Sequence, residues 1–197
     1  MSLDLHADDL SDLLEFLNVE KTHLVGLSHG AHVALALAAK RPEQVARLVL
    51  CSIGSKHSTR TKTIINSWLE ILKRSDLESM AWAVLPIISG EKFLKENERI
   101  LDKMVKAIML RNRKEPLIKN FEAMLTYPSP SSLVDNICHP CLFLSGAQDP
   151  MVSPGSAKYL ADLCNGGYTE IEECGHTVSV EKPDLFNQLV FEFLQNP

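Results

Sequence analysis

Short apolar runs alternate with segments of helical periodicity along much of the chain. Residues 7–17 place leucines at positions 10, 13, 14 and 17, which is the spacing of one face of an amphipathic helix. The run THLVGLS at 22–28 is short and largely apolar, as in a strand buried in a parallel sheet. An alanine-rich helix is predicted at 30–40, where Arg41-Pro42 ends it.

The same alternation continues to the end of the chain. It predicts buried strands at 46–52, 141–146 and 168–172, and helices at 156–163 and 183–194. Strands that alternate with helices indicate an α/β fold, in which a parallel sheet is flanked by helices on both faces.

Residues 56–130 break this alternation, because they show helical periods and no convincing strand. We expect a helical insertion between two strands of a core formed by residues 1–55 and 131–197. Residues 56–119 carry 14 Lys and Arg against 8 Asp and Glu, although the whole chain has a formal net charge of −5. This basic surplus is either a solvated face or an attraction for an anionic substrate or an acidic carrier protein.

Composition narrows the class of protein. A chain of 197 residues with 45% hydrophobic and 23% charged residues is typical of one soluble globular domain. Its net charge of −5 argues against a general nucleic-acid partner. No apolar run reaches the roughly 18 residues of a membrane span, and the first residues do not resemble a signal peptide. Five cysteines, an odd number, fit reduced thiols, so we expect a cytoplasmic protein without a membrane partner.

The candidate chemistry begins at Gly-Leu-Ser-His-Gly, residues 26–30. A strand that turns sharply into a helix strains the residue at its tip, and we expect both glycines to remove Cβ atoms that would clash there. Ser28 would then stand at the N-terminus of a helix, where free N–H groups favour a developing negative charge. The bare G-x-S-x-G pattern arises by chance in roughly one such chain in fifteen to twenty. Because the setting is an apolar strand and a helix, we interpret Ser28 as a nucleophile and the His29 N–H as an oxyanion donor.

A serine nucleophile needs a general base, and the base needs an acceptor that orients it. In a parallel sheet such partners lie just beyond the carboxyl ends of later strands. Asp149 follows the strand at 141–146, and His176 follows the strand at 168–172. Asp135 is a weaker alternative for the acid, because it reads as an ordinary loop residue.

In these three motifs the chain resembles the α/β-hydrolase superfamily, in its lidded serine esterase and acyl-hydrolase branch. The resemblance rests on GLSHG (26–30), LFLSGAQDPMVSP (142–154) and ECGHTVSVEKPDLFNQLVFEFL (173–194). It implies that Asp149 is the triad acid and that His176 is the general base. It also implies that the helical segment 56–130 is the lid that shapes the acyl pocket.

The resemblance predicts a serine hydrolase that cleaves a small-molecule carboxylic ester, thioester or lactone through an acyl-enzyme, without a metal or organic cofactor. Ser28 would attack the acyl carbon, His176 would take its proton, and Asp149 would orient the imidazole. Most lid tryptophans and methionines are expected to be packing residues. The candidates for the substrate pocket are Leu27, Trp68, Trp82 and Met124.

Other histidines and cysteines allow further interpretations. Cys138, His139 and Cys141 could form a zinc site with Cys174 and the neighbouring base, but Cys141 begins an apolar strand and no second C-x-x-C exists. His29 and His32 follow Ser28 in the first turn of the predicted helix. Each is either part of the pocket or an incidental residue at a helix start, and the latter interpretation is favoured.

The chain departs from the family pattern before the nucleophile. Relatives place several strands and an H-G type loop there, and this loop donates the second oxyanion N–H. Only 27 residues precede Ser28, so the strand at 22–28 should form an exposed apolar edge, and the oxyanion hole should have one donor. The alternative function is therefore a non-catalytic hydrolase-like fragment or interaction module that needs a second chain. A homodimer through the exposed edge is one such arrangement.

Overall fold

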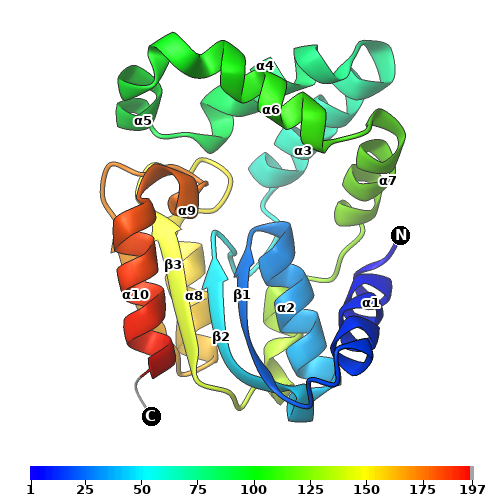
Figure 1. Cartoon of the computed structure of the whole chain (residues 1–197), viewed down its shortest axis with the longest axis vertical. Helices are drawn as coiled ribbons and strands as arrows, with labels where there is room; N and C mark the ends of the chain where they lie inside the picture. The colour runs from blue at the N-terminus through cyan, green and yellow to red at the C-terminus, as the bar shows by residue number, and fades with distance from the viewer. Residues whose placement is uncertain (196–197) are drawn as a thin grey trace.

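The computed structural model describes residues 1–195, which form a four-stranded parallel sheet with helices on both faces (Figure 1). The strands lie in the order β1-β2-β3-β4, and each pairs in parallel with the next. The predicted α/β class is thus confirmed, and each predicted strand is present with its ends shifted by about one residue. The strands are β1 (Thr22–Leu27), β2 (Val45–Cys51), β3 (Cys141–Gly146) and β4 (Gly167–Ile171).

Helices cover the two faces unequally. One face packs on α2 and α8, with α1 behind α2, around an apolar core that includes Leu48 and Phe143. The opposite face packs on α10, where Val49 and Leu142 contact Val190. The covering helices are α1 (Leu3–Phe16), α2 (His29–Lys40), α8 (Pro154–Leu163), α9 (Val178–Glu181) and α10 (Pro183–Gln195).

The first helix begins earlier than the sequence pattern predicts. It starts at Leu3 rather than at residue 7, because the Ser2 hydroxyl accepts the Leu5 N–H at 3.1 Å and caps the helix there. Leu3 is buried in the main core, so packing favours the additional turn. The start of α8 is also earlier, at Pro154, where the Ser153 hydroxyl accepts the Ser156 N–H.

Strand β1 lies at the edge of the sheet and pairs with β2 alone among the described residues. Val25 lies beside Val49 in the register and so faces the α10 side. Val49 is fully buried there, whereas Val25 is 47% exposed. The edge strand expected from the sequence is therefore present, and it carries an exposed valine.

Five helices separate β2 from β3 in the chain and lie above the carboxyl ends of the strands (Figure 1). They are α3 (Thr59–Arg74), α4 (Leu77–Ile88), α5 (Glu91–Glu96), α6 (Leu101–Arg111) and α7 (Lys114–Met124), and we call them the inserted helices. Their own apolar cluster contains Ile65, Trp68 and Phe121.

Short 3-10 turns link several elements, at Pro42–Gln44, Glu98–Ile100, Pro130–Ser132 and Val134–Asn136. Within residues 1–195, the helices are too short or too polar to cross a lipid bilayer.

Candidate active site

Ser28 occupies the tip of the turn between β1 and α2. Its backbone has φ 52° and ψ −111°, a conformation that L-residues rarely adopt and that costs about 1–3 kcal/mol. The turn is retained because the Ser28 N–H donates to the Cys51 carbonyl at 2.8 Å. The helix begins directly afterwards at His29, whose N–H belongs to the first turn and has no carbonyl partner within the helix.

The two glycines of the motif have different roles. A Cβ atom on Gly26 would lie 2.5 Å from the Gly30 oxygen and 2.7 Å from Ala31 Cα, so only glycine fits where strand and helix approach. A Cβ atom on Gly30 would meet nothing within 4 Å. The prediction that both glycines prevent a clash is therefore wrong for Gly30, because its Cα faces open space.

The three residues of the predicted triad lie in one hydrogen-bonded chain. Ser28 Oγ is 2.8 Å from His176 Nε2, and His176 Nδ1 is 2.7 Å from Asp149 Oδ2. Since a carboxylate accepts, Nδ1 carries the proton and Nε2 is free to accept from the serine hydroxyl. Both His176 and Asp149 are buried. This is the arrangement that general-base activation of a serine requires.

Asp149 is oriented by its own loop, which follows β3. Its Oδ1 atom accepts the Met151 N–H at 2.8 Å and the Val152 N–H at 3.0 Å, which leaves Oδ2 for the imidazole. Asp135, the weaker alternative for the acid, lies exposed in the 3-10 turn Val134–Asn136, and it is Asp149 that contacts His176.

The backbone of His176 is held from both sides. The Ser52 hydroxyl donates to its carbonyl at 2.6 Å, and its N–H donates to the Ile88 carbonyl at 2.9 Å. Ser52 follows β2, and Ile88 ends α4, so both the sheet and the inserted helices position the base.

Glu181 joins the same two parts of the molecule. Its Oε2 accepts the N–H groups of Gly90 and Gly175, each at 2.8 Å, and its Oε1 accepts the Thr177 N–H at 3.1 Å and hydroxyl at 3.0 Å. Gly90 follows α4, whereas Gly175 and Thr177 flank His176. One buried carboxylate thus ties the inserted helices to the loop that carries the base.

A small cavity of about 30 Å³ lies at Ser28 and His176. Of the four predicted pocket residues, Met124 lines it and the other three lie elsewhere. Leu27 packs toward α10, Trp68 is buried against Phe121 within the inserted helices, and Trp82 is 42% exposed on α4. The cavity wall also contains Ser52, Gly54, Lys56, Thr61, Ile65, Met151, Val152 and two histidines, His32 and His57.

His32 and His57 stack beside the nucleophile, with ring centroids 4.9 Å apart and planes 13° apart. The pKa of His32 is lowered to about 4, mainly by burial and in part by the nearby imidazoles of His57, His29 and His176, while its hydrogen bond to the Ser28 carbonyl opposes the shift. Burial also lowers the pKa of His57, with a smaller contribution from Lys62. Both rings are therefore neutral near pH 7.

His29 takes no part in this pair. Its ring lies against Tyr127, with Nε2 3.1 Å from the tyrosine hydroxyl, and edge-on to His6. Burial lowers the pKa of His29, and His6 adds to the effect. Of the two histidines after Ser28, the structure thus places His32 on the cavity wall and His29 against Tyr127, outside this wall.

Comparison with known proteins identifies the family. The model of the alpha/beta hydrolase family matches residues 1–189. The chain belongs to the alpha/beta hydrolase family. It is also 30% identical over 195 residues to a Bacillus subtilis (strain 168) protein assigned provisionally as a 2-succinyl-6-hydroxy-2,4-cyclohexadiene-1-carboxylate synthase, a match that covers 94% of this chain and 70% of that protein.

Solved structures agree with this assignment. MGS-M2, an alpha/beta hydrolase enzyme from a Medee basin deep-sea metagenome library, superposes with a TM-score of 0.92 at 26% identity, over 100% of this chain and 73% of that one. A thermophilic esterase from Thermogutta terrifontis gives a TM-score of 0.87 at 25% identity, over 99% and 72% of the two chains. The predicted superfamily is confirmed, and the chain is a member of an enzyme family.

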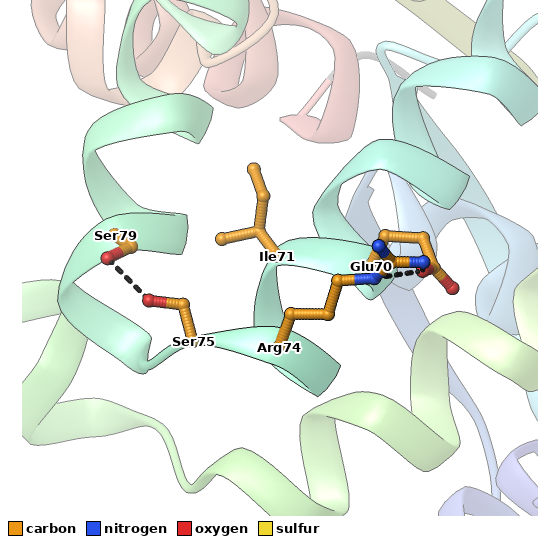
Figure 2. Close-up of a pocket in the computed structure, with 5 residues that line it drawn as sticks. All are labelled: Glu70, Ile71, Arg74, Ser75 and Ser79. Atoms are coloured by element: carbon orange, nitrogen blue, oxygen red, sulfur yellow. Dashed lines mark hydrogen bonds and ion pairs between the residues drawn. The ribbon is translucent and has the colours of Figure 1, made fainter.

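Two larger hollows of this hydrolase do not include Ser28 in their walls. A wide hollow of about 620 Å³ lies at the turn between α3 and α4 (Figure 2). Its polar groups already pair with one another, Arg74 with Glu70 at 2.9 Å and Ser75 with Ser79 at 3.0 Å. A second hollow of about 360 Å³ lies among Leu85, Phe93, Met104, Ile108 and Thr177, so it adjoins the residue after the base.

The structure gives no support to the zinc alternative. Nowhere in residues 1–195 do three His, Cys, Asp or Glu side chains gather as metal ligands. His139 Nε2 instead lies 2.9 Å from the Pro42 carbonyl, to which it donates, and Cys141 and Cys174 are buried.

Sequence reasoning missed several residues of the site. Ser52, Ile88 and His57 contact the base or the cavity through the folded chain, and no local motif marks them. One signal was available for Ser52, since it is the last residue of the strand predicted at 46–52 and so lies at the edge of the sheet that also carries the acid and the base.

The two motif glycines of the hydrolase should differ in their tolerance of alanine. We expect Gly26→Ala to lower the free energy of unfolding by roughly 3 kcal/mol or more, because its Cβ atom overlaps backbone atoms that cannot move independently. Gly30→Ala is the matched control and should be neutral or stabilising by up to about 1 kcal/mol, since alanine favours a helix. Urea denaturation followed by circular dichroism measures both, and equal midpoints would contradict the assignment.

Glu181→Gln should weaken the junction between the inserted helices and the base. The amide retains one acceptor oxygen, so some of the N–H groups of Gly90, Gly175 and Thr177 lose their partner in a buried place. We expect a loss of roughly 2–3 kcal/mol in the free energy of unfolding. Glu172→Gln, at an exposed position nearby, is the control. Urea midpoints that coincide for the two variants would show that Glu181 has no such role.

The buried histidines should make the fold sensitive to acid. The pKa of His32 is lower in the folded chain than in the unfolded one, so the unfolded chain binds more protons as the pH falls from about 6.5 to about 4. The free energy of unfolding should therefore decrease over this range, with up to about 3 kcal/mol due to His32. Thermal unfolding across the range, with His32→Gln compared with His23→Gln at an exposed position, measures that share. Parallel pH profiles for the two variants would disprove it.

Proposed function

We propose that this chain is a serine hydrolase that cleaves a carboxylic ester through an acyl-enzyme on Ser28, with thioesters and lactones as chemically equivalent electrophiles. The observation that carries the proposal is the hydrogen-bonded chain from Ser28 through His176 to Asp149, formed at a strained turn. A serine, an imidazole and a carboxylate at these distances have the geometry of nucleophilic acyl transfer. The esterase among the similar structures supports the same reaction class.

In the proposed reaction, Ser28 Oγ attacks the acyl carbon while His176 Nε2 takes its proton. Asp149 stabilises the imidazolium through Nδ1, and the backbone contacts of His176 keep Nε2 in place. The His29 N–H, at the start of α2, lies where a helix N-terminus favours the oxyanion. His176 then protonates the leaving group and activates a water that hydrolyses the acyl-enzyme.

The cavity at the serine suggests which part of a substrate lies there. This cavity of about 30 Å³ would hold a short acyl group. The larger hollow of about 360 Å³ beside Thr177 does not include Ser28 in its wall, so we assign it no part of the ester. The inserted helices line both, so we assign them the role of a lid, with residues 56–130 as the lid segment. An anionic substrate, suggested by the basic composition of this segment, remains a prediction, as does a cytoplasmic location.

A second candidate function rests on the edge of the sheet. Strand β1 has a free edge and carries the exposed Val25. This favours a module that binds a second chain, and a homodimer through β1 is the simplest form of it. Such pairing would place new backbone near Ser28, which directly follows the same strand.

A fluorophosphonate probe tests the proposed reaction directly. We expect one adduct per parent chain by intact-mass spectrometry and none in Ser28→Ala, because only an activated serine attacks the probe. His176→Ala should lose the adduct, and Asp149→Asn should slow its formation by up to about 10⁴-fold.

Sedimentation of the same samples shows whether adduct formation depends on dimerisation of the chain. A folded chain that forms no adduct, whether monomeric or dimeric, contradicts the hydrolase proposal and favours the binding module. An adduct that forms only at concentrations where the chain dimerises would mean that both proposals hold, with the dimer as the active hydrolase.

A further inference from the structure

The cavity at Ser28 contains a buried hydrogen-bond acceptor without a partner. His32 lies one turn after Ser28 on α2 and is 8% exposed. Its Nδ1 is 3.1 Å from the Ser28 carbonyl oxygen. A carbonyl only accepts, so Nδ1 carries the proton of the neutral ring, and Nε2 presents a lone pair. Nε2 is buried and has no hydrogen-bond partner among residues 1–195.

Two hydroxyl groups on the cavity wall already have hydrogen-bond partners. The Thr61 hydroxyl donates to the Met151 carbonyl at 2.6 Å, and the Ser52 hydroxyl donates to the His176 carbonyl at 2.6 Å. His57 faces His32 in a stack, and its own Nε2 is likewise buried without a partner among the described residues, so the stack brings no hydrogen bond to His32 Nε2. A ligand that fills the cavity is therefore the natural source of a donor for His32.

The size and lining of the cavity limit that ligand. A space of about 30 Å³ exceeds the roughly 10–15 Å³ that one water needs, so it holds a group of only two or three heavy atoms. Ile65, Met124, Met151 and Val152 supply apolar contacts around it. The fitting group is short and has one hydrogen-bond donor near its carbonyl carbon.

We propose that this cavity accepts the acyl part of a short 2-hydroxyacyl ester, of which the glycolyl group is the smallest, and that the substrate hydroxyl donates to His32 Nε2. The inference rests on the proposed function, because Ser28 must carry the acyl group. His32 determines specificity. An apolar acyl group of equal size leaves its acceptor unpaired, whereas a hydroxyl satisfies it.

Glycolyl and propionyl esters of 4-nitrophenol form the matched test, since they differ only by a hydroxyl in place of a methyl group. Each kcat/KM is divided by the rate constant for hydrolysis of the same ester by hydroxide, which corrects for the difference in intrinsic reactivity between the two esters. We expect the parent to prefer glycolyl by about tenfold or more. His32→Phe should bring the ratio close to one, and His32→Gln should restore part of the preference through its amide oxygen. His23→Phe, on the exposed part of β1, should keep the parent ratio.

A ratio that is the same in the parent and in His32→Phe overturns the proposal and means that trapped water satisfies Nε2.

A second measurement does not depend on turnover. Imidazole ¹⁵N spectra of Ser28→Ala should show an unprotonated His32 Nε2, whose resonance moves with glycolate but not with propionate. A proton on Nε2, or no response to glycolate, also overturns it. Absence of a fluorophosphonate adduct would reject the proposed function while leaving this binding result readable.

Discussion

The close approach of β1 to α2 is the constraint on which the rest of the site depends. Gly26 brings the strand within contact of the helix backbone, and the chain can then reverse only through a left-handed residue at Ser28. The serine hydroxyl consequently stands above the sheet, at the level where β3 and β4 end. Because the sheet is parallel, the loops after those two strands arrive at the same edge and bring Asp149 and His176 to it.

The inserted helices are part of this arrangement and do more than cover it. The carbonyl of Ile88, at the end of α4, accepts the His176 N–H. The Glu181 carboxylate accepts the N–H of Gly90, two residues later. A movement of α4 would therefore disturb the base as well as the hollow beside Thr177, whose wall includes Leu85 and Ile88. The position of the inserted helices and the placement of the imidazole are therefore coupled through a few hydrogen bonds.

The sequence predicted what local pattern determines. Apolar runs marked all four strands, and three short motifs placed Ser28, Asp149 and His176 at strand ends, where the structure brings them together. The start of α1 was missed because the capping residue, Ser2, lies outside the apolar periodicity. The interpretation of Gly30 failed because a motif does not show the space around a Cα atom.

What the sequence left open depends on contacts between distant segments. His57 precedes the inserted helices and reads as an ordinary loop residue until the fold stacks it on His32. These two imidazoles do not take the place of His176 as the base, because His176 is the ring that is hydrogen-bonded to the Ser28 hydroxyl. Burial is the main cause that lowers the pKa of both rings, and the Ser28 carbonyl fixes the proton of His32 on Nδ1. Of the imidazoles around the serine, His176 contacts the hydroxyl, whereas His32 contacts only the Ser28 carbonyl.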